Sequence, residues 1–154
     1  MNVFVADEQS ESVDVAAVRD LAGLVLENEN CPAESEVSVI LVGEEEMAGY
    51  NRRFLNRSGA TDVISLPIED AVPGRPPGSV VGGPPPMLGD VILAPSYIRR
   101  QASELEVDFH DEMALMVVHG LLHLLGYQHD SDEDANRMEQ RERSILEAAG
   151  RRRR

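Results

Sequence analysis

The chain has 154 residues, 42% of them hydrophobic, which is enough to bury the core of one domain and argues against wholesale disorder. No apolar run approaches the roughly 18 residues of a membrane-spanning helix, and the N-terminus lacks the pattern of a signal peptide, so we expect a cytoplasmic protein. The formal net charge of −14, with 28 acidic residues against 14 arginines, argues against general electrostatic attraction to nucleic acid, so local Arg clusters and a metal would have to attract a nucleic-acid substrate; DNA is not an expected partner.

The first half of the chain alternates predicted strands with predicted helices. Short apolar runs rich in β-branched residues predict strands at residues 3–5 and 37–42. Apolar residues at helical spacing predict a helix over residues 13–26 with one buried face. A second helix is expected over residues 44–55, because the acidic triplet at its start favours the positive N-terminal end of a helix.

The middle of the chain contains two more predicted strands, at residues 61–66 and 89–93, followed by a helix over residues 95–105. Between the strands, residues 69–87 are crowded with Pro and Gly and predict no regular element. We interpret this insertion as a surface loop. A lid over an active site is the alternative.

The most apolar predicted helix covers residues 108–125 and is expected to be central and buried on most sides. Gly126 is placed to end it in a left-handed cap. A capping pattern at Ser131 predicts a last helix that runs to about residue 149. These elements predict one domain over residues 1–150, and the four arginines at residues 151–154 are expected to form a disordered tail.

Three of the four histidines, His119, His123 and His129, fall within eleven residues. Helix positions four apart project from one face with Cβ atoms about 6 Å apart, so two imidazoles can bind one ion at about 2.1 Å each. Gly126 then stops the helix so that the chain can return with His129 as a third ligand. Three neutral nitrogens leave a fourth position open, as in catalytic zinc sites. The alternative, ordinary buried histidines, requires a separate hydrogen-bond partner for each ring.

The residue after the first of these histidines is Gly120, where H-E-x-x-H metalloproteases carry their general base. A glycine cannot accept a proton, so an ordinary zinc protease is excluded. Glycine also suits the close approach of another helix or of a ligand. The base must come from elsewhere or be hydroxide on the zinc, since zinc lowers the pKa of its bound water to about 7.

Cys31 is the single cysteine, which excludes a disulfide framework and a thiolate-rich metal site. Any metal must therefore be held by imidazole or carboxylate. Cys31 lies in a polar turn that leads into a strand, which makes it a weak candidate for a nucleophile.

The histidine segment MVVHGLLHLLGYQH resembles the H-G-x-L-H-L-x-G-Y-D-H motif of the YbeY family, the bacterial zinc-dependent endoribonucleases of rRNA maturation and ribosome quality control. Two further blocks, TDVISLP at residues 61–67 and LGDVIL at residues 88–93, are similar to strands of that family and occur in the same order. The resemblance covers about residues 37–149. It implies a small α/β sandwich with a mostly parallel four-stranded sheet, flanking helices and a central histidine-bearing helix. It also implies one zinc ion per chain.

Two departures from the family pattern concern the site. The family usually has Asp before its third histidine, where this chain has Gln128, so any orienting role of that Asp is lost or passes to Asp130. The family often has an Arg six residues before the Thr of the strand block, and here that position is Leu55. We interpret Arg57, with Arg53 as an assisting residue, as the stand-in for that Arg. The alternative is a solvated helix end.

The resemblance implies a zinc-dependent endoribonuclease that prefers single strands and acts on rRNA, including the 3′ end of 16S rRNA. Arg57 and Arg53 would stabilise charge on the transition state. Ser65 and Asp62, near a strand end, would contact substrate or fix a ligand, unless they are structural. Two alternatives stay open: a metal-dependent hydrolase of another substrate, and a ribosome-assembly factor with a mainly structural zinc, whose acidic surface binds basic ribosomal proteins.

Overall fold

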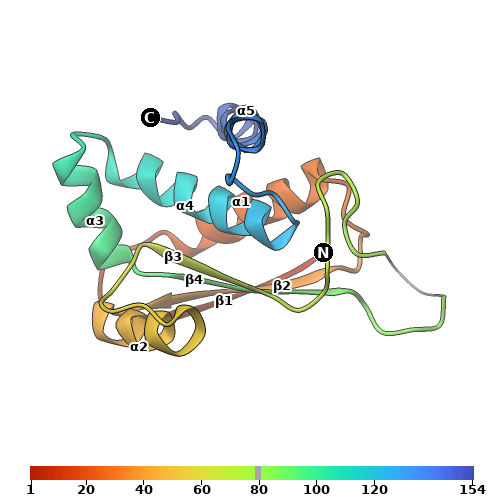
Figure 1. Ribbon diagram of the computed structural model, residues 1–154, viewed down its shortest axis with the longest axis horizontal. Coiled ribbons are helices and arrows are strands. Elements are labelled where there is room, and N and C mark those ends of the chain that lie inside the picture. The colour runs from red at the N-terminus through yellow and green to blue at the C-terminus, as the bar shows by residue number, and fades with distance from the viewer. Residues whose placement is uncertain (79–80) are drawn as a thin grey trace.

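The computed structural model describes residues 1–78 and 81–154, which form four strands and five helices in an α+β fold (Figure 1). The strands are β1 (Asn2–Glu8), β2 (Glu36–Val42), β3 (Val63–Pro67) and β4 (Met87–Leu93). The helices are α1 (Val15–Asn28), α2 (Glu44–Leu55), α3 (Pro95–Glu104), α4 (Phe109–Leu124) and α5 (Asp132–Ala148). Each predicted helix and strand is therefore present, with boundaries shifted by a few residues.

The four strands form one sheet in the order β1-β2-β4-β3. β1 pairs with β2 and β2 with β4 in parallel, whereas β3 pairs with β4 antiparallel at the edge. The mostly parallel sheet implied by the family resemblance is thus confirmed. The two central strands are largely apolar along their length, as expected for strands covered on both faces.

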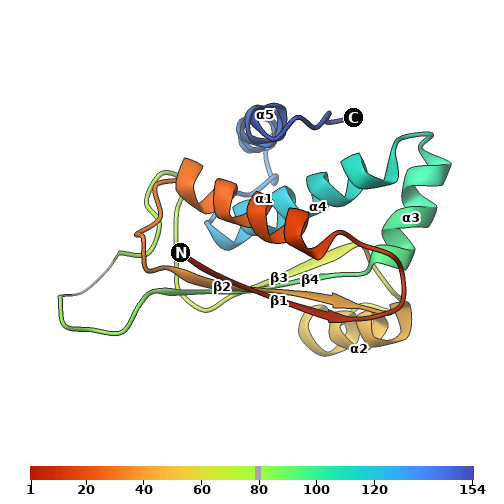
Figure 2. The same cartoon turned by 180° about the vertical axis from the view of Figure 1, so that it is seen from behind.

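Helices cover both faces of the sheet, so α4 becomes the centre of the molecule (Figures 1 and 2). α1 and α4 lie on one face with α5 outside them, and α2 lies on the other face. Of the 16 residues of α4, 12 are buried, which confirms the predicted central helix. None of the helices that the structure describes is both long and apolar enough to cross a membrane.

The predicted insertion at residues 69–87 connects the antiparallel strands β3 and β4 and ends one residue later than the loop itself, because Met87 already belongs to β4. Within its described residues, the only strand-like pairing is an isolated bridge between Val72 and Arg75. Residues 79 and 80 of this insertion lie outside the described residues.

The tail at residues 151–154, expected to be disordered, has no helix or strand, and three of its four arginines contact the domain. The side chains of Arg151, Arg153 and Arg154 form ion pairs with carboxylates of α4 and α5. Two of these carboxylates are buried, and a buried anion strongly favours a cationic partner. These contacts tie the tail to α4 and α5, and the disorder expected for residues 151–154 stays a prediction.

Candidate metal centre

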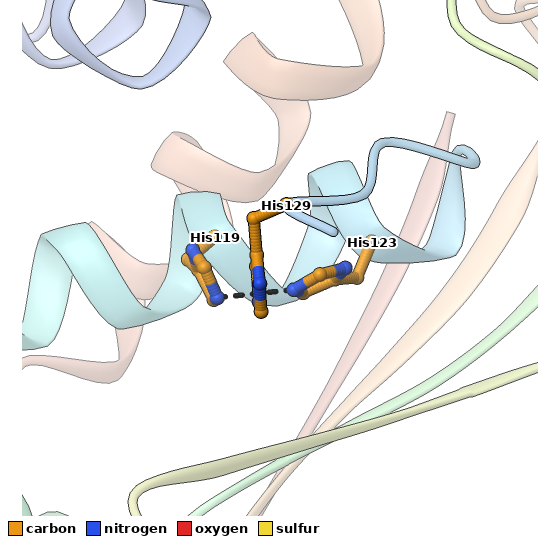
Figure 3. Close-up of side chains that lie close together, drawn as sticks. All are labelled: His119, His123 and His129. Atoms are coloured by element: carbon orange, nitrogen blue, oxygen red, sulfur yellow. Dashed lines mark hydrogen bonds between the residues drawn. The ribbon is translucent and has the colours of Figure 1, made fainter. Parts of the chain in front are cut away.

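Helix α4 carries two of the three histidines, and the third follows the turn at its end. The residues that begin and end α4 therefore position the site. At its start, the carboxylate of Asp108 accepts the N–H of Asp111 at 3.0 Å and caps the helix. At its end, Gly126 has φ of +94° and its N–H donates to the carbonyl of His123 at 3.0 Å. The predicted left-handed glycine cap is therefore present, and it turns the chain toward His129 (Figure 3).

A buried polar group anchors the turn between α4 and His129. The hydroxyl of Tyr127 donates to one carboxylate oxygen of Glu29 at 2.5 Å, and the Nε of Arg141 donates to the other oxygen at 3.1 Å. Burial first, and then the hydrogen bond to Glu29, raise the pKa of Tyr127 to about 12, so the hydroxyl keeps its proton. The turn is thus tied to both α1 and α5.

The imidazoles of His119, His123 and His129 converge on one point (Figure 3). Each residue offers one ring nitrogen, and these atoms lie within 4.8 Å of one another. The Nε2 atoms of His119 and His123 are 3.1 Å apart, and the ring centroid of His129 lies 5.0 Å from that of His123. His129 is exposed while the other two are half-buried, so the cluster lies where a substrate can reach it.

Hydrogen bonds on the far side of the His119 and His123 rings fix which nitrogen of each faces the cluster. The Nδ1 of His119 lies 2.6 Å from Oε2 of the buried Glu142. The Nδ1 of His123 lies 2.8 Å from the backbone carbonyl oxygen of Tyr127. Because a carboxylate and a carbonyl can only accept, the Nδ1 atoms of both rings donate a proton, and both Nε2 atoms face the cluster.

The charges of these groups suit metal binding. Burial, with the charge of His119 as the second cause, lowers the pKa of His123 to about 4, so this ring is neutral at pH 7. Burial raises the pKa of Glu142, but the hydrogen bond and charge of His119 together with Arg153 lower it more, and the net shift is downward. Glu142 is therefore an ionised carboxylate that accepts the proton of a ligand ring.

The distance between the Nε2 atoms of His119 and His123 can be compared with the spacing of two ligands on a metal ion. With Nδ1 of both rings turned to other acceptors, the two Nε2 atoms face each other 3.1 Å apart, an arrangement in which one cation can be shared between them. A tetrahedral zinc with nitrogens at about 2.1 Å separates two ligand nitrogens by roughly 3.4 Å. Neutral imidazoles are ligands that zinc prefers. The three histidines can therefore form a metal site.

Gly120 allows α4 to lie close against the sheet. A Cβ atom at this position would lie 2.6 Å from Cγ1 of Val91 and 2.9 Å from Cγ2 of Val63, closer than side chains pack. The close approach expected at Gly120 is thus made to strands β3 and β4, and not to another helix or to a ligand. Any larger residue here would face the sheet, so this position could not supply a base to the cluster.

Two other candidates from the strand block, Ser65 and Asp62, make structural hydrogen bonds. The hydroxyl of Ser65 donates to the carbonyl of Gly120 at 2.7 Å and ties β3 to the histidine helix. The carboxylate of Asp62 accepts the N–H of Val63 at 2.8 Å and the side-chain amide of Gln101 at 3.2 Å. Both side chains therefore hold the beginning of β3 in place beside the cluster.

The buried Cys31 lies outside this cluster. Its side chain belongs to the main core and is 6% exposed. Burial, assisted by the charge of Glu29, raises the pKa of the Cys31 thiol to about 11, so the reactive thiolate is not available at neutral pH.

The chain is similar in sequence to a family of known proteins. A sequence model of the family described as Endoribonuclease YbeY matches residues 4–150. The chain belongs to the YbeY family. The match extends the resemblance from the three motif blocks to nearly the whole chain, including the N-terminal strand and helix.

Individual relatives agree with this assignment. A protein named Endoribonuclease YbeY from Acidothermus cellulolyticus is 40% identical over 138 residues, which cover 89% of this chain and 84% of that one. A protein of the same name from Rhodococcus erythropolis is 35% identical over 147 residues, covering 96% of this chain and 81% of that one. The solution structure of TM1509 from Thermotoga maritima superposes with a TM-score of 0.64 at 22% identity, covering 96% and 88% of the two chains, and supports the fold.

The arginines expected to replace the missing YbeY family Arg lie near the end of α2, which covers the face of the sheet opposite α4 (Figures 1 and 2). The guanidinium of Arg53 lies over the rings of Tyr50 and Phe54, at 5.6 and 5.5 Å from their centroids. Arg57 follows a left-handed residue, Asn56, at the end of the helix. Within residues 1–78 and 81–154, neither arginine forms an ion pair or a side-chain hydrogen bond with the histidines. The structure thus does not join them directly to the cluster.

The side chain that orients a histidine of the cluster comes from α5 and not from the segment beside His129. In the part of the chain that the structure describes, no hydrogen bond joins Asp130 to any of the three histidines. Glu142 of α5 orients His119 instead. Sequence reasoning missed this residue, although a charged side chain at a core position of α5, four residues after the buried Met138, is a detectable sign.

Proposed function

We propose that this protein is a zinc-dependent endoribonuclease that cleaves single-stranded RNA in the cytoplasm, in rRNA maturation and ribosome quality control. Processing of the 3′ end of 16S rRNA is included in this proposal. The observation that carries it is the convergence of three imidazoles, those of His119, His123 and His129, in a member of the YbeY family. We assign the activity to residues 1–150 as one metal-dependent hydrolase domain.

The proposal gives each group at the cluster a distinct task. When bound, zinc supplies Lewis-acid polarisation of a phosphate oxygen and acidifies a water molecule. His119, His123 and His129 would hold it through one ring nitrogen each. Ser65 and Asp62 act as positioning residues, because their hydrogen bonds fix β3 beside the histidine helix.

An acidic protein needs local cations to bind RNA, and α2 offers them. Within the described residues, half of the arginines have no ion pair, and three of these, Arg52, Arg53 and Arg57, lie at one end of α2. Phe54 beside them is 47% exposed and stacks on Tyr50. Arginines contact phosphates and exposed aromatic rings stack on unpaired bases, which favours a single-stranded substrate.

Removal of the metal tests the proposal. The protein purified with its native metal is expected to cleave single-stranded rRNA fragments faster than duplex fragments of the same sequence. Chelation should abolish cleavage, and return of zinc should restore it, because no other group at the cluster can replace the metal's charge. Cleavage that continues unchanged after complete metal removal would contradict the metal-dependent reaction.

The role of Arg57 is tested by its replacement. We expect Arg57→Ala to lower kcat for single-stranded RNA by about 10- to 100-fold. This decrease is smaller than the one caused by removing a buried hydrogen-bond donor to the transition state, because the Arg57 side chain is exposed. The control is Arg19→Ala, which removes the same charge from an exposed position of α1. Steady-state cleavage kinetics with equal kcat for the two variants would rule out a specific role for Arg57.

One observation favours a second function. A net charge of −14 suits contact with basic ribosomal proteins better than contact with RNA, so the protein also has the properties of a ribosome-assembly factor with a mainly structural zinc. Absence of cleavage by the zinc-loaded protein, together with salt-sensitive binding to a ribosomal protein, would favour this function over the nuclease. The peptidase alternative is disfavoured, because Gly120 faces the sheet.

A further inference from the structure

The C-terminal arginines contact carboxylates on two different helices. Arg153 pairs through Nε with Oε1 of Glu142 at 3.1 Å and through Nη1 with Glu139 at 2.9 Å, both on α5. Arg154 pairs through Nε with both carboxylate oxygens of Glu112 on α4, at 2.8 and 3.1 Å. The tail leaves α5 and extends over α4, so it bridges the two helices (Figures 1 and 2).

Two of these carboxylates are almost fully buried, so their charge and position depend on their hydrogen-bond partners. Glu142 is 2% exposed and Glu112 is 1% exposed. A buried carboxylate keeps its charge and position only where fixed donors replace the lost water. For each of these two residues, a tail arginine is one of those donors.

Glu142 differs from Glu112 because its second oxygen faces the metal centre. Its Oε1 accepts from Arg153, and its Oε2 accepts the Nδ1 proton of His119 at 2.6 Å. The second partner of Glu112 is instead the side-chain amide of Gln101, at 2.8 Å. One tail arginine therefore reaches a proposed metal ligand through a single carboxylate, and its neighbour does not.

We propose that Arg153 is a positioning residue of the metal centre, which holds the Glu142 carboxylate so that Glu142 in turn holds His119 with Nε2 toward the metal. The inference rests on the metal binding proposed above. Arg153 is itself well fixed, since its side chain is 18% exposed and lies between two carboxylates one turn apart. Without it, Glu142 loses one of its two fixed donors and can turn away from the imidazole.

The test compares Arg153→Met with Arg154→Met in the full chain. Both variants remove a tail arginine from a buried carboxylate, so both are expected to lower the thermal unfolding temperature. Zinc affinity, measured by competition with a chromogenic chelator, should fall by about 10- to 100-fold in Arg153→Met, the usual effect of losing support behind a metal ligand. Zinc affinity should stay within about twofold of the wild type in Arg154→Met. Arg153→Lys should recover part of the zinc affinity that Arg153→Met loses, because lysine restores a donor to Glu142.

A second measurement does not depend on the metal. In the metal-free protein, the Nδ1–H proton resonance of His119 is protected from water by its hydrogen bond to Glu142. It should broaden in Arg153→Met and persist in Arg154→Met. Wild-type zinc affinity and a persisting resonance in Arg153→Met, or equal losses in both variants, would overturn the inference. A wild-type chain that binds no zinc would overturn the proposed function, while the resonance would still decide whether Arg153 positions His119.

Discussion

Replacing His119 with alanine is expected to lower zinc affinity and the rate of RNA cleavage by more than about 100-fold. Loss of a group behind a metal ligand already costs about 10- to 100-fold, and this change removes the ligand nitrogen itself. The same result is expected for His123→Ala, because its Nε2 lies only 3.1 Å from that of His119 and the two face one point. Zinc content after dialysis against a metal buffer and initial cleavage rates measure the effect.

The chain supplies a matched control for these changes. His110 lies on the same helix, is exposed and stands outside the cluster, so His110→Ala should keep both zinc and activity. Circular dichroism of each variant separates loss of the site from loss of the fold. RNA cleavage that survives in His119→Ala would come from a contaminating nuclease, and the catalytic proposal would then have no support.

Replacing Gly126 with alanine is expected to lower the free energy of unfolding by roughly 3 kcal/mol, through left-handed strain and a steric clash together. The glycine has φ of +94°, and a Cβ there would lie 2.2 Å from the carbonyl oxygen of Ala71 and 2.8 Å from Cα of Val72. These are backbone atoms of the loop after β3, which cannot move as freely as a side chain. Zinc affinity should fall as well, because the same turn positions His129.

Gly150 provides the comparison for this prediction. It also has positive φ, +73°, but a Cβ there would meet nothing within 4 Å. Gly150→Ala should therefore lose only about 1 kcal/mol, the strain of the left-handed conformation alone. Urea unfolding of both variants measures the difference. Equal losses would mean that the contact with Ala71 contributes nothing to the stability of this turn.

The features that the sequence predicted well depend on local interactions. Helix α4 was expected over residues 108–125 and covers Phe109–Leu124, because its capping carboxylate, its apolar residues and its terminal glycine act within one segment. The convergence of His119 and His123 follows from the same helical spacing. Gly126 was identified from its position alone, since few residues other than glycine adopt its conformation.

The features that the sequence did not predict depend on packing between distant segments. Glu142 contacts His119 only because α5 packs against α4. The sequence pattern of α5 does not indicate which helix α5 packs against. Gly120 was expected to face a helix or a ligand, but the sheet lies there. The tail arginines have no periodicity to interpret, and their order comes from buried carboxylates 11 and 42 residues away.

The hydrogen bond between Glu142 and His119 makes the metal centre depend on the docking of one helix, α5, against α4. Proteins open locally at much lower free energy than they unfold globally, and terminal helices are often the first to detach. If α5 detaches while the sheet and α4 stay folded, His119 loses its hydrogen-bond acceptor. Glu29, which holds Tyr127 in the turn before His129, then loses its donor Arg141. The lifetime of the centre is then set by the opening rate of α5, and not by the global stability of the domain.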